Sequence, residues 1–235
     1  MNDLHSIYCR ELGIIAWQQR NAEPPISMPS AHMADKLAPL RTKVAACTAC
    51  ELHTQRMQTV FGVGSETAKL MLIGEAPGFH EDQQGEPFVG RAGQLLGSML
   101  KSIGFERNDV YIANVLKCRP PNNRDPLPLE VKTCTAFLDQ QIALIQPMLL
   151  VALGRIAAHY LLQTKVPLET LRNKIHAYGK MQIPLITTYH PAYLLRNPID
   201  KKKAFFDLQH IKKRLLTQRG DEPHGKLPNT AAEKL

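Results

Sequence analysis

The densest group of residues able to do chemistry lies in a glycine-rich stretch, residues 74–93. It reads Gly-Glu-Ala-Pro-Gly-Phe-His-Glu-Asp over 74–82 and Gly-Glu-Pro-Phe-Val-Gly-Arg-Ala-Gly over 85–93. The glycines and prolines fix a tight backbone, and carboxylates, a histidine and a phenylalanine stand between them. This mixture favours a pocket for a flat, polar group over a phosphate-binding loop, which would carry fewer acidic residues.

The segments on either side of this stretch indicate where it lies. The apolar run 70–73 predicts a short buried parallel strand. Residues 94–103 have the apolar spacing of a helix. The stretch therefore lies at the carboxyl end of a strand and the amino end of a helix, where open α/β sheets bind their ligands.

Composition narrows the class of protein. The net charge of +8 and the pI near 9.3 predict a polyanionic partner, most simply nucleic acid, with an unspecialised basic surface as the alternative. No run is long enough to span a membrane, and the start lacks the basic and apolar regions of a signal peptide. We expect a cytoplasmic, nucleoid-associated protein without membrane contact, in which five cysteines serve metal or redox chemistry rather than disulfides.

The rest of the chain alternates strands and helices. Further strands are predicted at 110–115, 148–153 and 183–188, and further helices at 129–145, after 154 and at 201–216, the last with Phe205, Leu208, Ile211 and Leu215 inward. This order predicts a three-layer α/β/α sandwich around a central four-stranded parallel sheet over residues 35–216. We expect an amino-terminal helix at 1–20, a proline-rich linker at 21–34 and a disordered tail at 217–235.

The cysteines have the spacing of metal ligands. Cys47 and Cys50 form a C-x2-C pair, and Cys118 and Cys134 offer a second, wider pair. Four thiolates can hold zinc or a 4Fe–4S cluster. Because one of the wide pair follows a strand and the other lies inside a helix, a larger cluster is favoured, with unligated thiols as the alternative. Cys9 is expected to be a small apolar residue of the first helix.

Other polar side chains follow the remaining predicted strands. Asn114 begins a loop that runs to residue 124, Gly154 and Arg155 follow the third strand, and His190 follows the fourth. Because parallel strands deliver these segments to one sheet edge, we expect them to converge. An amide reads the edge of a nucleobase, an aromatic ring stacks on its face, and cations hold phosphates.

Five linked motifs together resemble the family 4 uracil-DNA glycosylases, the iron–sulfur members of their superfamily. They are Cys-x2-Cys, Gly-Glu-Ala-Pro-Gly-x3-Asp, Gly-x-Pro-Phe-Val-Gly-x-Ala-Gly, Asn-Val-x-Lys-Cys-Arg-Pro-Pro-x-Asn-Arg and His-Pro-Ala-Tyr-Leu-Leu-Arg. They occur in order between Ala46 and Leu216. The resemblance implies excision of uracil from DNA by hydrolysis of its N-glycosidic bond, in base excision repair. It also implies a 4Fe–4S cluster on Cys47, Cys50, Cys118 and Cys134.

The resemblance assigns roles around a flipped uracil. Phe88 is expected to stack on the ring, Asn114 to read the 4-carbonyl and ring N–H, and His190 to donate to the 2-carbonyl as the base departs. Ala76 and Gly78 would line the same pocket. A second set is expected to contact DNA, with either leucine as the wedge: Arg119, Arg124, Leu194, Leu195, Arg196 and Lys201.

The group that activates water stays open. The best-known branch of the superfamily has an aspartate at the position of Ala76. Family 4 lacks this aspartate, as does this chain. The polar candidates nearby are Glu75, Glu81, Asp82 and Asn123. Of these we favour Glu81 to orient the water, with Glu75 holding the loop or contacting the base.

Three alternatives stay open for the function. A relative that traps uracil-containing strands covalently would carry a histidine in the loop after the second strand, and residues 117–130 contain none. A non-catalytic replication adaptor would use the basic surface to bind DNA. In a third alternative, the cysteines hold zinc in a nucleic-acid-binding module.

Residues 12–20, which contain Trp17, are similar to the segment by which the psi subunit of the bacterial clamp loader docks. This resemblance implies a replication partner. We expect a monomer.

Overall fold

The structure of the protein, a computed structural model, describes residues 35–217. Contacts divide the chain into Met1–Asp35 and Lys36–Leu235, and the second unit contains the fold. The predicted docking helix, the linker, Cys9 and the predicted tail from residue 218 onward lie outside the described residues. Within residues 35–217, no helix combines the length and apolarity needed to cross a membrane.

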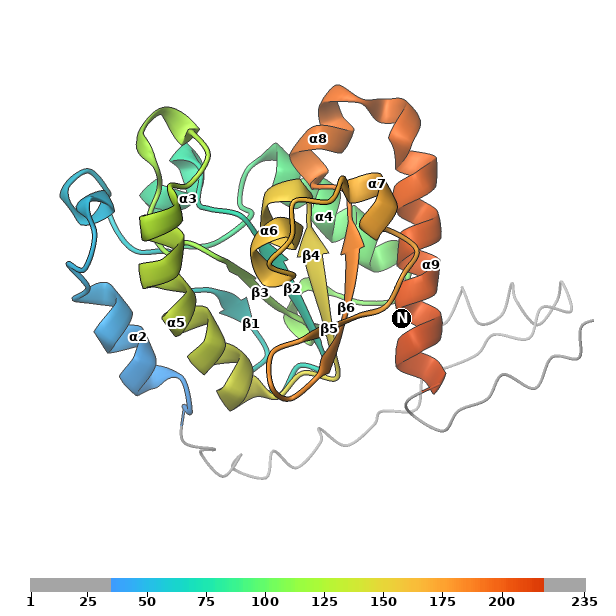
Figure 1. Cartoon of the computed structure of the whole chain (residues 1–235), viewed down its shortest axis with the longest axis horizontal. Helices are drawn as coiled ribbons and strands as arrows, with labels where there is room; N and C mark the ends of the chain where they lie inside the picture. The colour runs from blue at the N-terminus through green and yellow to red at the C-terminus, as the bar shows by residue number, and fades with distance from the viewer. Residues whose placement is uncertain (1–34, 218–235) are drawn as a thin grey trace, which may run out of the picture. The chain divides into compact units, whose positions relative to one another are not determined.

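A six-stranded mixed sheet forms the centre of the fold (Figure 1). Its strands are β1 (Val63–Gly64), β2 (Leu70–Gly74), β3 (Tyr111–Asn114), β4 (Leu149–Leu153), β5 (His176–Tyr178) and β6 (Ile183–Thr188), in the spatial order β1-β3-β2-β4-β6-β5. The four inner strands are parallel, which confirms the predicted four-stranded parallel sheet. The short outer strands β1 and β5 are antiparallel additions that the prediction missed.

Helices cover both faces of this sheet. The longer ones are α2 (Ala38–Ala45), α4 (Arg91–Ser102), α5 (Pro128–Ile145) and α9 (Lys201–Thr217). The shorter ones are α3 (Phe79–Gln84), α6 (Arg155–Leu161), α7 (Leu168–Leu171) and α8 (Pro191–Arg196), with single 3₁₀ turns η1 (Glu51–Thr54), η2 (Arg107–Asp109), η3 (Pro121–Asn123) and η4 (Pro198–Asp200). Helices α5 and α6 lie in front of the sheet and α4 behind it, as right-handed crossovers require (Figure 1).

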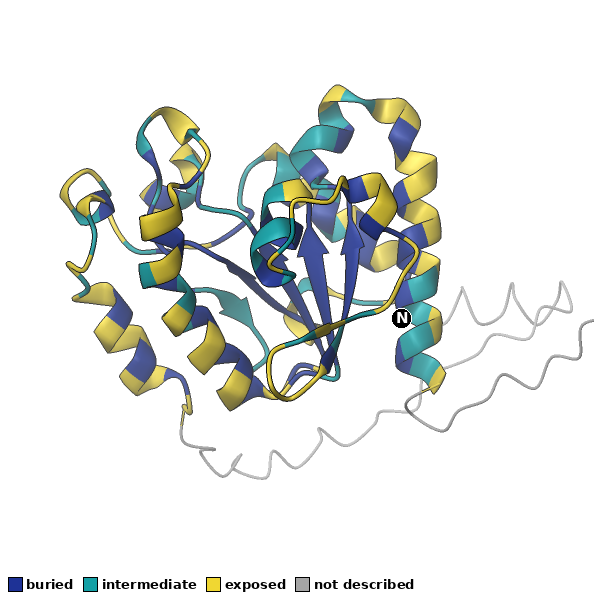
Figure 2. Ribbon diagram, in the orientation of Figure 1, coloured by how far each residue is buried: buried dark blue, intermediate teal, exposed yellow. Residues whose placement is uncertain are grey.

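The sheet is the buried layer of the molecule (Figure 2). Every residue of β2, β3 and β4 is buried, as expected for parallel strands covered on both faces. Helix α9 turns Leu208, Ile211 and Leu215 inward as predicted. The prediction for Phe205 was wrong, since this ring is 45% exposed. Asp207 takes an inward position instead, as the next paragraph describes.

A buried ion pair fixes α9 to the sheet. Asp207, 1% exposed, accepts bonds from Nε and Nη2 of Arg172 at 2.8 and 2.9 Å. The Thr188 hydroxyl, at the end of β6, donates to the same carboxylate at 2.7 Å. Since Thr188 comes just before the predicted His190 loop, this pair steadies the strand end that delivers the loop.

Candidate active site

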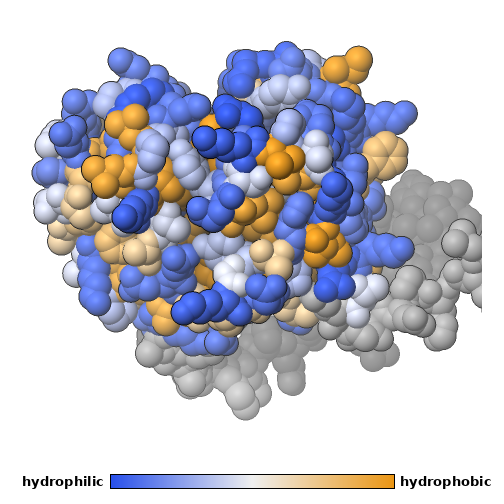
Figure 3. All heavy atoms as spheres, viewed as in Figure 1, coloured by the Kyte–Doolittle hydropathy of each residue, from blue (hydrophilic) through white to orange (hydrophobic). Residues whose placement is uncertain are grey.

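A cleft of about 460 Å³ lies at the carboxyl edge of the parallel strands, and we call it the edge pocket. Ten of the sequence-predicted site residues line it: Glu75, Ala76, Gly78, Glu81, Phe88, Asn114, Asn123, Arg124, His190 and Arg196. In the space-filling view the top of the molecule is notched between the part carrying α3 and the part carrying α8 (Figures 1 and 3). The expected convergence of the strand-end loops is confirmed.

The end of β2 allows two side chains to approach each other. Gly74 lies opposite Asn114 in the register of β2 and β3. A Cβ on Gly74 would lie 2.4 Å from Oδ1 of Asn114 and 2.7 Å from the Phe88 ring. The absence of a side chain at Gly74 therefore lets the amide and the aromatic ring share the floor of the pocket.

The Asn114 side chain is buried without a complete set of partners. The residue is 2% exposed, and its Oδ1 accepts no hydrogen bond from the described part of the chain. An unpaired buried acceptor costs about 1–3 kcal/mol. Such an atom in a pocket is suited to receive a ligand N–H.

Two buried side chains, Lys117 and Gln141, support the backbone of Asn114 through hydrogen bonds. Lys117, 1% exposed, donates from Nζ to the Asn114 carbonyl at 2.8 Å and to Oε1 of Gln141 at 2.6 Å. Nε2 of Gln141 donates to the Phe61 carbonyl and to the Tyr111 hydroxyl oxygen. Neither Lys117 nor Gln141 was predicted from the sequence to support the site.

Phe88 holds its ring in the pocket through a strained backbone. Its φ of 56° is in the left-handed region, which non-glycine residues rarely adopt. Gly93 permits this turn, because a Cβ there would clash with the Phe88 carbonyl. Arg107 donates to the carbonyl of Pro87 and braces the same turn. The ring stacks toward His190 with centroids 5.5 Å apart.

His190 enters the pocket as a neutral donor. Its Nδ1 accepts a bond from the Ala192 backbone N–H at 3.1 Å, which leaves Nε2 to carry the proton. Burial lowers the pKa of His190 to about 4, so the ring is uncharged at neutral pH. Gly154, at φ +90°, leaves room for the ring, because a Cβ there would lie 2.8 Å from that of His190.

Glu81 is engaged by the loop backbone. Its Oε2 accepts from Gly78 N–H at 3.2 Å, and its Oε1 accepts from Val89 and Gly90 at 3.2 and 3.4 Å. The carboxylate thus ties α3 to the Phe88 turn and has about one acceptor position left for water. Asp82 is likewise engaged, since both its oxygens accept from Met57 N–H.

Glu75 lies in a different environment. No hydrogen bond to its carboxylate is made by the described residues. Burial, followed by the charge of Asp125, raises the pKa of Glu75 to about 7. A carboxylate that titrates near neutrality is suited to proton transfer. Asp125 lines the same pocket and was missed, although it directly follows the predicted Arg124.

The predicted DNA-contacting residues separate into two groups. Arg196 is exposed and lines the pocket, and Lys201 is exposed at the start of α9. Arg124 makes a two-pronged pair with Glu130 at 2.9 and 2.6 Å, while Arg119 bonds Oδ1 of Asn123 at 2.9 Å.

The two predicted wedge residues differ in their exposure. Leu194 is only 1% exposed and packs in the core. Leu195 is partly exposed. Their expected role in DNA therefore remains a prediction, for which Leu195 is the accessible residue.

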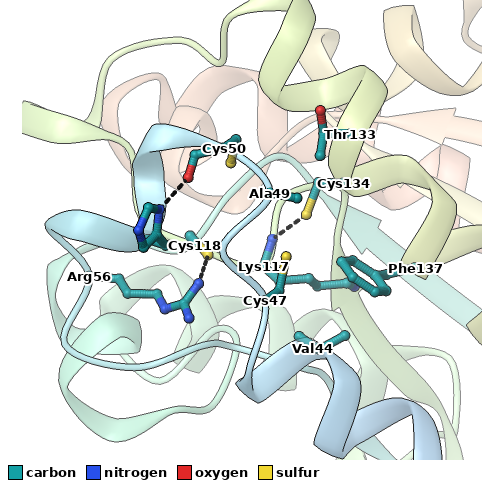
Figure 4. Close-up of a pocket in the computed structure, with 11 residues that line it drawn as sticks. Val44, Cys47, Ala49, Cys50, Arg56, Lys117, Cys118, Thr133, Cys134 and Phe137 are labelled. Carbon is teal, nitrogen blue, oxygen red and sulfur yellow. Dashed lines mark hydrogen bonds between the residues drawn. The ribbon is translucent and has the colours of Figure 1, made fainter.

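The four predicted cysteines line one apolar cavity, with Val44, Phe137 and Lys117 among its other walls (Figure 4). Cys47 and Cys50 come from the segment after α2, Cys118 follows β3 and Cys134 lies in α5. Arg56 Nη1 lies 3.1 Å from Sγ of Cys118, and the Lys117 backbone N–H lies 3.2 Å from Sγ of Cys134. Both contacts suit sulfurs that carry negative charge.

Burial disfavours the thiolate form of the two most buried cysteines, Cys118 and Cys134. Burial raises the pKa of Cys118, and burial raises that of Cys134 to about 11. Within residues 35–217, no three His, Cys, Asp or Glu side chains are grouped tightly enough to ligate a single metal ion. Four soft donors around one apolar cavity with N–H groups directed at sulfur nevertheless fit a group larger than one ion.

The fold and the edge pocket define an α/β protein whose parallel-sheet edge offers a ring face, an amide and a neutral imidazole. Residues 61–209 match the family model described as the uracil DNA glycosylase superfamily. The chain is 44% identical to the type-4 uracil-DNA glycosylase of Archaeoglobus fulgidus, over 72% of this chain and 88% of that protein.

Two further relatives carry the same name. That of Thermotoga maritima is 47% identical over 66% of this chain and 81% of its own, and that of Sulfurisphaera tokodaii is 40% identical over 78% and 86%. The chain therefore belongs to the uracil DNA glycosylase superfamily, in its type-4 branch.

Proposed function

We propose that the protein is a uracil-DNA glycosylase that flips uracil out of DNA and hydrolyses its N-glycosidic bond, leaving an abasic site for base excision repair. The observation that carries the proposal is the buried Oδ1 of Asn114, which accepts no hydrogen bond from residues 35–217 and lines the pocket with Phe88 and His190. Membership of the family and the printed function of its type-4 relatives support it.

Recognition follows from the donors and acceptors of the Asn114 amide. Uracil presents an N–H at ring position 3 and a carbonyl at position 4, which complement the amide oxygen and the amide N–H. Cytosine presents a ring acceptor and an amino group, so both contacts would be mismatched. A site that hydrogen-bonds its substrate rejects such an edge because buried groups stay unpaired.

His190 serves the departing base. As the bond between C1′ and N1 breaks, its electron pair moves onto uracil and the 2-carbonyl oxygen becomes more negative. The Nε2–H of neutral His190 donates to that oxygen and stabilises the developing charge. The fixed bond from Ala192 to Nδ1 keeps this tautomer in place.

Glu75 is our choice for the group that receives the proton of the attacking water, because it lines the edge pocket and its pKa is raised. Water adds to C1′, its proton passes to the Glu75 carboxylate, and uracil leaves as an anion. The pKa of about 7 leaves much of Glu75 ionised at neutral pH while keeping it basic enough to accept a proton. Glu81, bonded to three backbone N–H groups, shapes the loop and can position the same water.

We further propose that Cys47, Cys50, Cys118 and Cys134 hold a 4Fe–4S cluster. Its contribution is structural: once bound, it joins the segment after α2 to the loop that begins at Cys118. The thiols must lose their protons on binding, and the N–H groups of Arg56 and Lys117 then face thiolate sulfur. That loop carries Asn123, which lines the edge pocket, and Arg119, which donates to Oδ1 of Asn123. The bound cluster would therefore position these groups toward DNA.

Two measurements test these proposals. The first follows alkali cleavage of a labelled oligonucleotide that carries one uracil, beside strands with thymine or cytosine there. Cleavage at uracil alone supports the glycosylase, and uracil-dependent binding without an abasic product would instead indicate a trap. The second counts metal per chain: four iron atoms with sulfide support the cluster, and one zinc ion contradicts it. A Cys118→Ser variant that folds and binds DNA like the wild type would remove the structural role.

A further inference from the structure

Two hollows continue the edge pocket across the front of the molecule, over α6, and we call them together the α6 trough. The first, of about 440 Å³, has five residues in common with the edge pocket: Glu75, Asp125, His190, Tyr193 and Arg196. The second, of about 710 Å³, has three residues in common with the first: Asp125, Arg155 and Ile156. The shared walls make one continuous depression from the candidate site to the loop before α7.

The walls of the trough suit a nucleotide strand. Its ring and aliphatic surfaces include Tyr193, Ile156 and Tyr160, and its cations are Arg155, Lys165 and Arg196. The carboxylates Glu75, Asp125 and Glu169 also line it, so ring and apolar contacts rather than net charge favour a strand there. Alternating aromatic or apolar faces and cations are the features by which proteins bind single strands without sequence preference. In Figure 3 the face over α6 likewise mixes apolar and hydrophilic side chains.

One ion pair crosses the trough where its two hollows meet. Arg155 Nη2 lies 3.5 Å from Oδ2 of Asp125, and the two side chains are 57% and 68% exposed. Exposed pairs of this kind contribute little to stability, so Arg155 can exchange the carboxylate for a phosphate at small cost. The Asp125 carboxylate would then repel the phosphates of the strand, because its negative charge remains in the trough.

A duplex cannot use the trough as a single strand can. Bases flanking the uracil are stacked and paired in a duplex, and only the damaged nucleotide is extruded. In a single strand the neighbouring base is free to leave the stack and lie against Ile156 and Tyr160. The trough begins at His190, where the flipped base ends, so a neighbouring nucleotide meets it directly.

We propose that the α6 trough binds the unpaired nucleotides that flank uracil in single-stranded DNA. This assignment rests on the proposed glycosylase function and extends it to a strand preference. Contacts in the trough add to the affinity for single strands and leave the extrusion of uracil from a duplex to the edge pocket. Asp125 limits that affinity.

The experiment compares variants on matched substrates. Ile156→Glu introduces charge on a partly exposed face of α6, and Lys165→Glu reverses an exposed cation further along the trough. Ile175→Glu is the control, since Ile175 is 45% exposed and lines neither hollow of the trough. For each protein we would measure uracil excision from single-stranded and duplex oligonucleotides, and binding of a uracil-free single strand by fluorescence anisotropy.

Each trough variant is expected to lower the ratio of single-strand to duplex excision by about fivefold or more, the factor for one lost stacking or phosphate contact. Asp125→Asn is expected to tighten binding of the uracil-free strand, which loss of a purely structural contact would not do. Unchanged ratios in both trough variants, or equal losses on both substrates, would overturn the proposal. Wild type that binds the strand but excises no uracil would refute the glycosylase function alone.

Discussion

Replacing Gly74 by alanine tests whether the close approach at the end of β2 is what creates the edge pocket. The φ of Gly74 lies outside the left-handed region, so alanine meets no backbone penalty. The added Cβ would meet Asn114 Oδ1 at 2.4 Å and the Phe88 ring at 2.7 Å. Both neighbours are the groups assigned to the uracil edge and face.

The size of the effect follows from those contacts. Ordinary van der Waals contact begins at 3.4 Å, so the amide must retreat by 3.4 − 2.4 = 1.0 Å and the ring by 3.4 − 2.7 = 0.7 Å. A displacement of about 1 Å in a positioned group costs on the order of 100-fold in rate. Overpacking costs about 1–3 kcal/mol of stability, partly offset by the smaller entropy of the unfolded chain, by about 0.4–1 kcal/mol.

The assay is kcat/KM for uracil excision, with thermal unfolding measured in parallel. Gly97→Ala in α4 is the matched control, because a Cβ there meets no atom within 4 Å. It is expected to keep full activity and to gain up to about 1 kcal/mol of stability from helix propensity. Wild-type kcat/KM in Gly74→Ala would refute the packing argument, whatever its melting temperature.

Three further outcomes are expected. The rate of excision should rise with pH through a midpoint near 7, set by ionisation of Glu75, and level off above it. Glu75→Gln should remove this rise, and a rise that persists in the variant would contradict the assignment. Because the pKa of Glu75 is raised in the folded state, this group also favours unfolding as pH rises between about 4.5 and 7. Arg172→Met leaves Asp207 buried without its charged partner and should cost about 3–5 kcal/mol in thermal unfolding, whereas a change below about 1 kcal/mol would show that the pair is dispensable. Iron chelation should lower the melting temperature of the wild type, and an unchanged value contradicts a structural cluster.

The central strands were predictable because their signal is local. Parallel strands covered on both faces are continuous apolar runs, and residues 183–188 were predicted with the bounds that β6 has in the structure. The outer strands β1 and β5 have only two and three residues, and none of these residues is fully buried, so neither length nor periodicity marks them. Phe205 fits the inward spacing of α9, but the structure buries Asp207 instead, because Arg172 pairs with its negative charge.

The convergence of the site was predictable from topology, since every loop that follows a parallel strand reaches one edge. The different environments of Glu75 and Glu81 were not predictable from the sequence. Glu81 is held by three backbone N–H groups from two separate turns, a geometry set only when α3 and the Phe88 turn pack together. The pKa of Glu75 depends likewise on burial and on Asp125, which lies in another loop.

The most direct test of the central claim is Asn114→Ala, compared with wild type by alkali cleavage of a single-uracil strand. Loss of the amide that we propose reads the uracil edge is expected to abolish most uracil-dependent cleavage, while the folded protein keeps its melting temperature to within a few degrees. Binding of a uracil-free strand should be unchanged. Cleavage at wild-type rates in the variant would contradict the assignment of the edge pocket as the uracil site.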